Sequence, residues 1–293
     1  MDGTDLRNTL GAVAVARDVV LVHGPEAVAF LQGQLSQDVD GLAVGASAPA
    51  FLLQPTGKVE AVVRITRSAD DEVLLDVDAG WGEAVLARLR RFKLRTKADL
   101  DPATWTGVAL RGPGAGEAAA SMAVDGARHL PACWPGVEAA DVLGPDGATS
   151  FVELAGERAL EALRVEAGVP AMGREVSGST IPAELGQWLI DASVSFTKGC
   201  YTGQELVARI DSRGGNVPKP LRGLVLDATG AEAGASVLHG GADVGRVTSV
   251  AMSSALGPVA LALVGRGVAP GTAVEVGTAD GLVTATVAEL PLR

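Results

Sequence analysis

The chain has 293 residues, of which 47% are hydrophobic and 20% are charged, a composition typical of folded globular proteins and not of disordered ones. Its formal net charge of −11 argues against a generic polyanion binder, so we expect no nucleic-acid partner. Two cysteines and three scattered histidines exclude a disulfide framework and a cysteine-only metal site, and we expect no metal.

The N-terminal sequence lacks the basic start and apolar core of a signal peptide. No apolar run approaches the roughly 18 residues of a membrane span. We therefore expect a cytoplasmic protein without a membrane partner.

The first half of the chain mixes strand and helix patterns. A strand is predicted over 13–22, followed by a helix with Val28, Leu31, Leu35 and Val39 on one face. The turn signal Pro55-Thr56-Gly57 joins strands 48–54 and 58–66 into a hairpin. Further elements follow in the order strand 72–79, helix 83–95, strand 105–111, helix 114–123, strand 149–154 and helix 156–167, which ends at Gly168.

A long loop over 169–186, rich in Gly, Pro and Ser, is of the kind that tends to be functional. It leads into a predicted strand over 190–196. A basic run comprises Arg88, Arg90, Arg91, Lys93, Arg95 and Lys97. We interpret it as the solvated face of a helix, with a positive rim around a small anionic ligand as the alternative.

The pattern changes after Pro218-Lys219-Pro220 to short Val- and Leu-rich segments broken by Gly, Asp and Pro. Five such segments, at 221–227, 244–250, 258–264, 272–277 and 282–289, predict an all-β module, a small barrel. We therefore expect an α+β region over residues 1–213 and a β-barrel domain over 220–293.

The segment SFTKGCYTGQE, residues 195–205, contains Cys200 and the only tyrosine of the chain, Tyr201. Thr202 and Glu205 fit a capping box, which would place Cys200 just ahead of a helix N-terminus. The helix start and Lys198 would both favour the thiolate and lower the pKa of Cys200. Gly199 and Gly203 would leave room for a partner. The alternative is a buried, inert cysteine in a tight turn, and no base for a nucleophile is evident.

The segment Lys198-Gly199-Cys200-Tyr201-Thr202-Gly203-Gln204-Glu205, continued by Val207-Ala208-Arg209 and Arg213-Gly214, resembles the signature of the YgfZ-type folate-binding proteins. These are relatives of the glycine cleavage T-protein, an aminomethyltransferase. Two further segments are similar to this family, FLQGQLSQD at 30–38 and LRVEAGVP at 163–170. The resemblance extends over nearly the whole chain.

The resemblance implies a folate-binding α+β region of ferredoxin-like units with a C-terminal β-barrel, and tetrahydrofolate or a derivative as the cofactor. It implies an accessory function in iron–sulfur cluster assembly or repair, with iron–sulfur proteins or their assembly machinery as partners. Cys200 would be the functional thiol, assisted by Lys198. Such a protein would not be a conventional enzyme.

The same resemblance indicates candidate residues for folate binding. A carboxylate can accept paired hydrogen bonds from a pterin edge, and Glu166 is the candidate. Arg164, Arg209 and Lys198 are candidates for the anionic glutamyl tail. Tyr201, Gln204 and Glu205 complete the predicted folate contacts. The aromatic side chains that could stack on the ligand are Trp81, Trp188, Phe196 and Tyr201, with core packing as the alternative that we favour for most of them.

The alternative function is a folate-dependent aminomethyltransferase or other one-carbon transferase. In the transferases an aspartate contacts folate, and an ungapped placement puts that position at Val85. Asp76 and Asp78 are nearby but out of register. This placement argues against transferase chemistry unless a small gap restores an aspartate.

Overall fold

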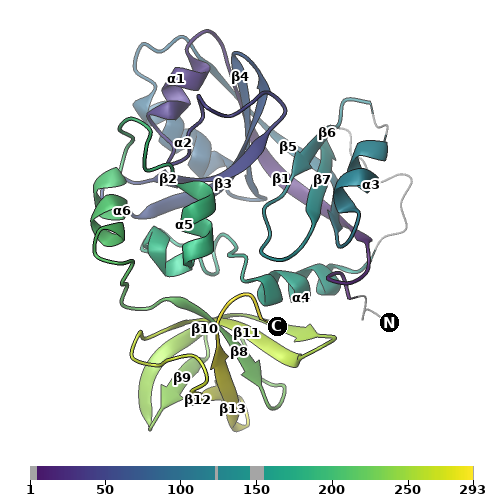
Figure 1. Ribbon diagram of the computed structural model, residues 1–293, viewed down its shortest axis with the longest axis vertical. Coiled ribbons are helices and arrows are strands. Elements are labelled where there is room, and N and C mark those ends of the chain that lie inside the picture. Colours follow the sequence, from purple (N-terminus) through teal and green to yellow (C-terminus); the bar gives the residue numbers. More distant parts are fainter. Residues whose placement is uncertain (1–4, 123–124, 146–154, 293) are drawn as a thin grey trace.

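The computed structural model describes residues 5–122, 125–145 and 155–292. A seven-stranded sheet with its helices forms the upper part of the molecule in Figure 1, and a barrel forms the lower part. The α+β class with a C-terminal all-β barrel, expected from the sequence, is confirmed. The division into domains at residues 214–219 stays a prediction.

The large sheet is antiparallel and has the strand order β2-β3-β4-β1-β5-β7-β6. Two long strands at its centre pair over their whole length from Gly11↔Arg111 to His23↔Asp99. The strands are β1 (Gly11–His23), β2 (Ser47–Leu53), β3 (Val59–Ala69), β4 (Glu72–Asp78), β5 (Asp99–Arg111), β6 (Arg128–Pro131) and β7 (Ala139–Gly144). The predicted hairpin around Pro55-Thr56-Gly57 is the β2–β3 pair.

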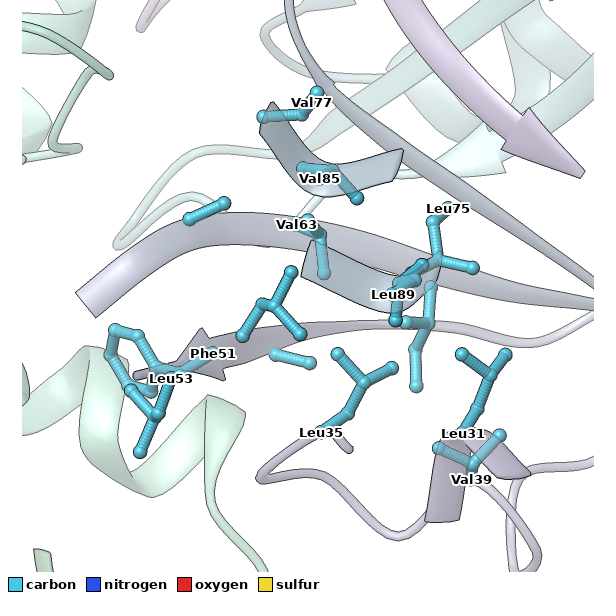
Figure 2. Close-up of a cluster of buried hydrophobic side chains, with 14 of the residues drawn as sticks. Leu31, Leu35, Val39, Phe51, Leu53, Val63, Leu75, Val77, Val85 and Leu89 are labelled. Carbon is cyan, nitrogen blue, oxygen red and sulfur yellow. The ribbon is translucent and has the colours of Figure 1, made fainter. Parts of the chain in front are cut away.

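The main core lies between this sheet and the helices α1 (Ala27–Gln32), α2 (Gly82–Phe92) and α5 (Gln187–Ser193). Figure 2 shows Leu31, Leu35, Phe51 and Leu89 among its side chains. Alternating burial along β3 sends every second side chain into this core, as expected for a half-buried strand.

The predicted helix through Val28, Leu31, Leu35 and Val39 is too long, because α1 ends at Gln32. Beyond Gly33 the chain turns so that the Ser36 hydroxyl donates to Ser193 O and accepts from Phe51 N–H, at 2.6 and 2.8 Å. Leu31, Leu35 and Val39 are nevertheless fully buried, so the apolar spacing correctly identifies core positions.

Helix α4 (Glu157–Ala167) ends at Gly168, whose φ of 72° is the left-handed conformation expected of a C-cap glycine. The predicted strand 190–196 is wrong, because residues 187–193 form α5. A short apolar run does not distinguish a buried strand from a buried helix. The predicted strand 149–154 lies outside the described residues.

The closed barrel has the strand order β10-β11-β8-β13-β12-β9. Five strands match the predicted segments, whereas the four-residue β9 has no counterpart among them. The strands are β8 (Leu221–Leu226), β9 (Ser236–His239), β10 (Ala242–Ser253), β11 (Gly257–Val264), β12 (Ala273–Thr278) and β13 (Gly281–Ala288). Helices α3 (Ala115–Ser121) and α6 (Gln204–Asp211) and the 3₁₀ helix η1 (Pro182–Leu185) complete the elements.

Candidate functional site

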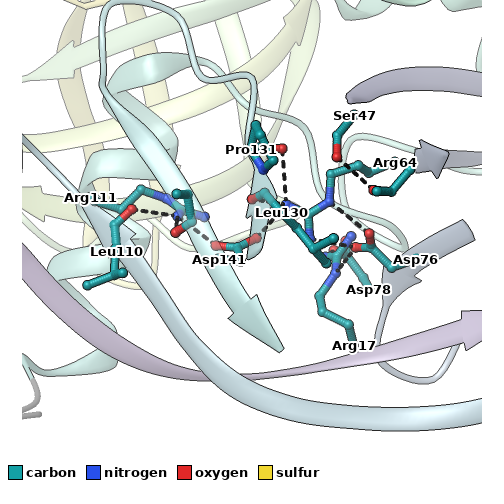
Figure 3. Close-up of polar contacts among 12 residues, drawn as sticks. Arg17, Ser47, Arg64, Asp76, Asp78, Leu110, Arg111, Leu130, Pro131 and Asp141 are labelled. Carbon is teal, nitrogen blue, oxygen red and sulfur yellow. Dashed lines mark hydrogen bonds and ion pairs between the residues drawn. The ribbon is translucent and has the colours of Figure 1, made fainter. Parts of the chain in front are cut away.

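Three arginines and three aspartates form a connected network on the large sheet (Figure 3). Arg64 on β3 donates to Asp76 Oδ2 on β4 and to Asp141 Oδ2 on β7, at 2.7 Å each. Arg17 on β1 donates to Asp76 at 2.9 Å and also pairs with Asp78. Arg111 on β5 donates to Asp141 at 2.7 Å. The network therefore links five strands.

The charges of the network balance, which explains how it can be buried. Asp76 is fully buried and Asp141 is 6% exposed. Burial alone would raise the pKa of Asp141, but the charges of Arg111 and Arg64 outweigh it and lower the pKa to about 2. Burial opposes the charge of Arg64, whereas Asp76 and Asp141 raise its pKa above the ordinary value. Asp141 and Arg64 therefore remain ionised at neutral pH.

A cavity of about 410 Å³ opens beside this network, and we call it the central cavity. Arg17, Arg64, Arg111 and Arg164 contribute to its wall together with Asp78 and Asp141. Its apolar and aromatic lining includes Pro49, Val62, Trp134, Pro170, Met172, Trp188 and Leu189. A concave site of this size with a few convergent polar groups is typical of small-molecule binding.

Asp78 differs from the other carboxylates of the network. Its side chain is 37% exposed, whereas that of Asp76 is fully buried. One oxygen pairs with Arg17 and the other accepts from Met172 N–H at 2.9 Å. Because a carboxylate offers about four acceptor positions, Asp78 retains capacity for a ligand in the cavity.

Arg164 connects α4 with the loop over 169–175 and with the barrel. It donates to Glu161 in α4, to Val169 O and to Glu175 Oε2, the last two at 2.7 and 3.1 Å. It also donates to the Ser249 hydroxyl of β10 at 2.6 Å, and this hydroxyl donates to Glu175 Oε1 at the same distance. Arg164 is the one predicted folate-tail residue that lines the central cavity.

Glu166 points to a different place from Arg164, because neighbours two apart on a helix face different sides. It lines a groove of about 480 Å³ between α4 and β10, and Arg7 Nε lies 3.5 Å from its carboxylate. Of the four aromatic residues proposed for stacking, Trp188 lines the central cavity, and Trp81 and Tyr201 pack in the core. The Phe196 side chain is half exposed.

Cys200 is exposed and lies in a loop that Lys198 fixes to the segment after α1. The Lys198 ammonium donates to the carbonyls of Gln32, Leu35 and Gln37 at 2.7, 2.8 and 2.7 Å. Burial lowers the pKa of Lys198 to about 8. Lys198 thus acts as an anchor of the Cys200 loop, which we define as residues 195–203.

The predicted capping box at Thr202 is wrong. The N-cap of α6 is Gly203, with φ of 83° and no side-chain cap. Gln204 instead accepts from Tyr201 N–H with its side-chain oxygen at 3.1 Å. A glycine in the left-handed region displaces the helix start by one residue, because only glycine adopts this conformation without cost.

The remaining predicted folate contacts lie in or next to the Cys200 loop and are not among the residues that line the central cavity. Glu205 and Arg209 are exposed on α6. Sequence reasoning missed Arg17, Arg64, Arg111, Trp134 and Asp141. The signal is weak but present for three of them: Arg17, Arg64 and Asp141 lie within apolar stretches of their strands, and such a residue needs a partner on a neighbouring strand.

Neither a metal centre nor a membrane-spanning helix is found within the residues that the structure describes. No group of three or more His, Cys, Asp or Glu among them could hold a metal ion. In the same part of the chain, no helix is long and apolar enough to cross a membrane.

Comparison with protein-family models matches residues 219–292 to the glycine cleavage T-protein C-terminal barrel domain. The aminomethyltransferase T of the glycine cleavage system from Bartonella henselae has the same fold, with a TM-score of 0.80, 22% identity and coverage of 98% of this chain and 87% of that chain.

Among curated proteins, an uncharacterized protein from Haemophilus influenzae is 28% identical over 200 residues, covering 68% of this chain and 67% of the relative. The tRNA-modifying protein YgfZ of Pectobacterium carotovorum is 29% identical over 214 residues, covering 66% of this chain and 63% of that protein. The YgfZ of Edwardsiella ictaluri is 29% identical over 220 residues, with 67% and 65% covered. The match thus spans slightly less than two thirds of both YgfZ proteins. Together with the barrel and the shared fold, these similarities relate the chain to the YgfZ proteins and to the glycine cleavage T-protein.

Proposed function

We propose that the chain binds tetrahydrofolate or a derivative in the central cavity. The observation that supports this most is the composition of the wall, which combines Asp78, four arginines and two tryptophans around about 410 Å³. Folate has a flat pterin with hydrogen-bond donors on one edge and an anionic glutamyl tail. The cavity offers a complement to each of these parts.

Asp78 is the residue that would accept hydrogen bonds from the donor edge of the pterin. Its carboxylate is partly exposed and holds unused acceptor capacity beside Arg17 and Met172 N–H. Trp188 and Trp134 provide flat apolar surfaces in the same wall. Aromatic faces of this kind stack on planar ligands.

Arg111 is the residue that would meet an anionic group. It is 4% exposed, and its buried Nε has no hydrogen-bond partner in the described residues. An unpaired buried donor is costly, by roughly 1–3 kcal/mol, so a ligand atom that accepts from Nε would relieve that cost. Its guanidinium also stacks on Trp134, 4.4 Å from the ring centre.

Calorimetric titration with tetrahydrofolate tests the site. Asp78→Asn should weaken binding about tenfold or more, because the amide offers one acceptor and replaces the other with donors. Glu166→Ala is the matched control, since Glu166 lines the groove between α4 and β10 and should leave binding unchanged. The reverse result, loss with Glu166→Ala and retention with Asp78→Asn, would place folate in that groove.

We further propose that the Cys200 thiol is the functional group through which the chain assists iron–sulfur proteins. The thiol is exposed, and the space beside Gly199 is open, since a Cβ added at this glycine would meet no atom within 4 Å. A large partner could therefore reach the thiol. The relatives are named for tRNA modification. We propose that this chain also supports the modification of tRNA in the cell.

Cells that carry Cys200→Ala should show reduced activity of iron–sulfur enzymes and reduced modified nucleosides in tRNA, with normal protein levels. Thr197→Ala is the control, because Thr197 is also exposed in the Cys200 loop and does not line the central cavity. Equal enzyme activities in the two variants would contradict a function for Cys200.

One observation favours the alternative, a folate-dependent one-carbon transferase. The ungapped placement puts the position of the transferase aspartate at Val85, which is buried in the core and cannot contact a ligand. Asp78 in the cavity wall supplies an acidic residue instead. Purified protein that transfers the methylene of an aminomethyl donor to tetrahydrofolate with release of ammonia, and loses this activity with Asp78→Asn, would establish it.

A further inference from the structure

A basic surface lies at the C-terminal end of α2 and in the segment that follows. The ten residues RLRRFKLRTK, 88–97, contain no acidic residue. Arg88 is buried, and Lys93 is half-buried. We define the basic surface as Arg90, Arg91, Lys93, Arg95 and Lys97.

Few acidic groups neutralise this surface. Among the described residues, Lys93 lies 3.7 Å from Asp99, and no salt bridge joins Arg90, Arg91 or Arg95 to a carboxylate. Glu26 accepts from the backbone N–H of Lys97 at 2.7 Å. In the part of the chain that the structure describes, Lys93 is therefore the one cation of the five that pairs with a carboxylate, and the surface remains positive.

Helix stability alone does not explain the surface. Cations in the last turn of a helix interact favourably with its dipole, which accounts for Arg90 and Arg91. Arg95 and Lys97 lie beyond the helix end. Arg95 has φ of 57°, the one positive φ of a non-glycine residue in the described chain. Its side chain is exposed and does not pack in the core. Glycine would fit this conformation better, and an arginine costs roughly 1 kcal/mol there.

We propose that the basic surface binds the phosphate backbone of RNA. This proposal rests on the link to tRNA modification under the proposed function. A net charge of −11 led us to expect no nucleic-acid partner. That expectation treats charge as a property of the whole chain, but at physiological salt charges are screened beyond about 8 Å, so a local cluster acts independently of distant carboxylates.

RNA fits this surface better than an anionic membrane does. A membrane-binding surface combines cations with a broad apolar face. Leu94, at 80% exposed, is the one large hydrophobic side chain of residues 88–97 that is strongly exposed. Guanidinium groups without carboxylate partners are well suited to phosphates, which they bind in bidentate fashion.

The basic surface and the Cys200 loop share their supporting segments. Arg88 donates to Leu53 O at 2.9 and 3.2 Å and to the Gln34 side chain at 3.1 Å. The adjacent Gly33 O accepts from Thr202 N–H at 3.1 Å. Arg88, which precedes the basic surface in α2, is therefore held by the same segments that support the Cys200 loop.

Binding of fluorescently labelled bulk transfer RNA, measured by anisotropy at several salt concentrations, tests the proposal. The triple variant Arg90→Gln, Arg91→Gln, Arg95→Gln should bind RNA about tenfold or more weakly. The slope of log K plotted against log salt concentration should become less steep by about 2 to 3, because each lost phosphate contact reduces it by roughly 0.7–0.9. Arg128→Gln, Arg246→Gln, Arg266→Gln removes the same charge at exposed sites elsewhere and should retain most of the affinity.

Equal losses in the two triple variants, or no salt-dependent binding by the wild type, would overturn the proposal. Stronger binding to anionic phosphatidylserine vesicles than to RNA would also overturn it. Arg95→Gly adds a separate test: it should weaken RNA binding while the protein keeps or gains stability, because the left-handed backbone suits glycine.

Tetrahydrofolate binding separates this inference from the proposed function. The triple variant alters none of the residues that line the central cavity and should bind folate as the wild type does. If wild-type protein binds RNA but not folate, the folate proposal fails and the basic surface stands. If it binds folate but not RNA, the reverse holds.

Discussion

Lys198 shows how much one side chain can contribute to a functional loop. Its ammonium joins three backbone carbonyls of residues 32–37 to the Cys200 loop. The sequence suggests a cation acting on the thiol, but the hydrogen bonds of this cation are made to backbone. Position in the sequence shows that Lys198 is near Cys200, whereas only the fold shows where its charge is directed.

Lys198→Met should lower the free energy of unfolding by about 2 kcal/mol, because three carbonyls lose charge-assisted hydrogen bonds while the apolar stem is retained. Urea denaturation measures this, and amide hydrogen exchange should speed up across 198–203. Lys219→Met removes an exposed lysine and should cost less than about 0.5 kcal/mol. Equal costs would contradict the anchoring role.

Gly199 and Gly203, in the same short segment, have different roles. A Cβ at Gly203 would lie 2.5 Å from Gln54 O and 2.8 Å from Leu53 Cβ, and the φ there is 83°. Gly199 has open space around it. The sequence suggests that both glycines make room for a partner, but Gly203 instead allows α6 to start against the end of β2.

Gly203→Ala should therefore destabilise the protein by about 2 kcal/mol or more, from the left-handed backbone and the contact with Gln54 O. Gly199→Ala should change stability by less than about 1 kcal/mol. Thermal unfolding of the two variants, each of which adds one methyl group to the same loop, makes the comparison. A similar melting temperature for both would contradict the assigned roles.

The elements could largely be predicted from sequence, but the site could not. The β2–β3 hairpin and the barrel have strong local signals in Pro55-Thr56-Gly57 and in short alternating strands. Helix α5 lacks such a signal, and its short apolar run predicts a strand instead. Arg17, Arg64, Arg111 and Arg164 stand on four separate elements, and only sheet register and helix packing bring them into one wall.

At the scale of the molecule, the arginine–aspartate network couples stability to pH. The folded-state pKa of Asp141 is about 2, below its ordinary value of 3.8, because Arg111 and Arg64 outweigh the effect of burial. A depressed pKa contributes stability that is fully present above pH 4 and is lost as pH falls toward 2. This contribution is about 2 kcal/mol from the size of the shift.

The gap in unfolding free energy between wild type and Asp141→Asn should therefore be widest above pH 4 and should narrow as pH falls toward 2. Urea denaturation at pH 6, 4 and 3 measures the gap. Asp227→Asn, which removes an exposed aspartate on the barrel side, should show no such narrowing. If the difference in unfolding free energy between wild type and Asp141→Asn does not change with pH, the ion pairs do not lower the pKa of Asp141.

The central claim is that the cavity beside this network is a folate site. Calorimetric titration of the wild-type chain with tetrahydrofolate tests it most directly. The account predicts one site per chain, with binding weakened about tenfold or more by Asp78→Asn and unchanged by Glu166→Ala and Cys200→Ala. Absence of binding to the wild type, or full affinity in Asp78→Asn, would contradict it.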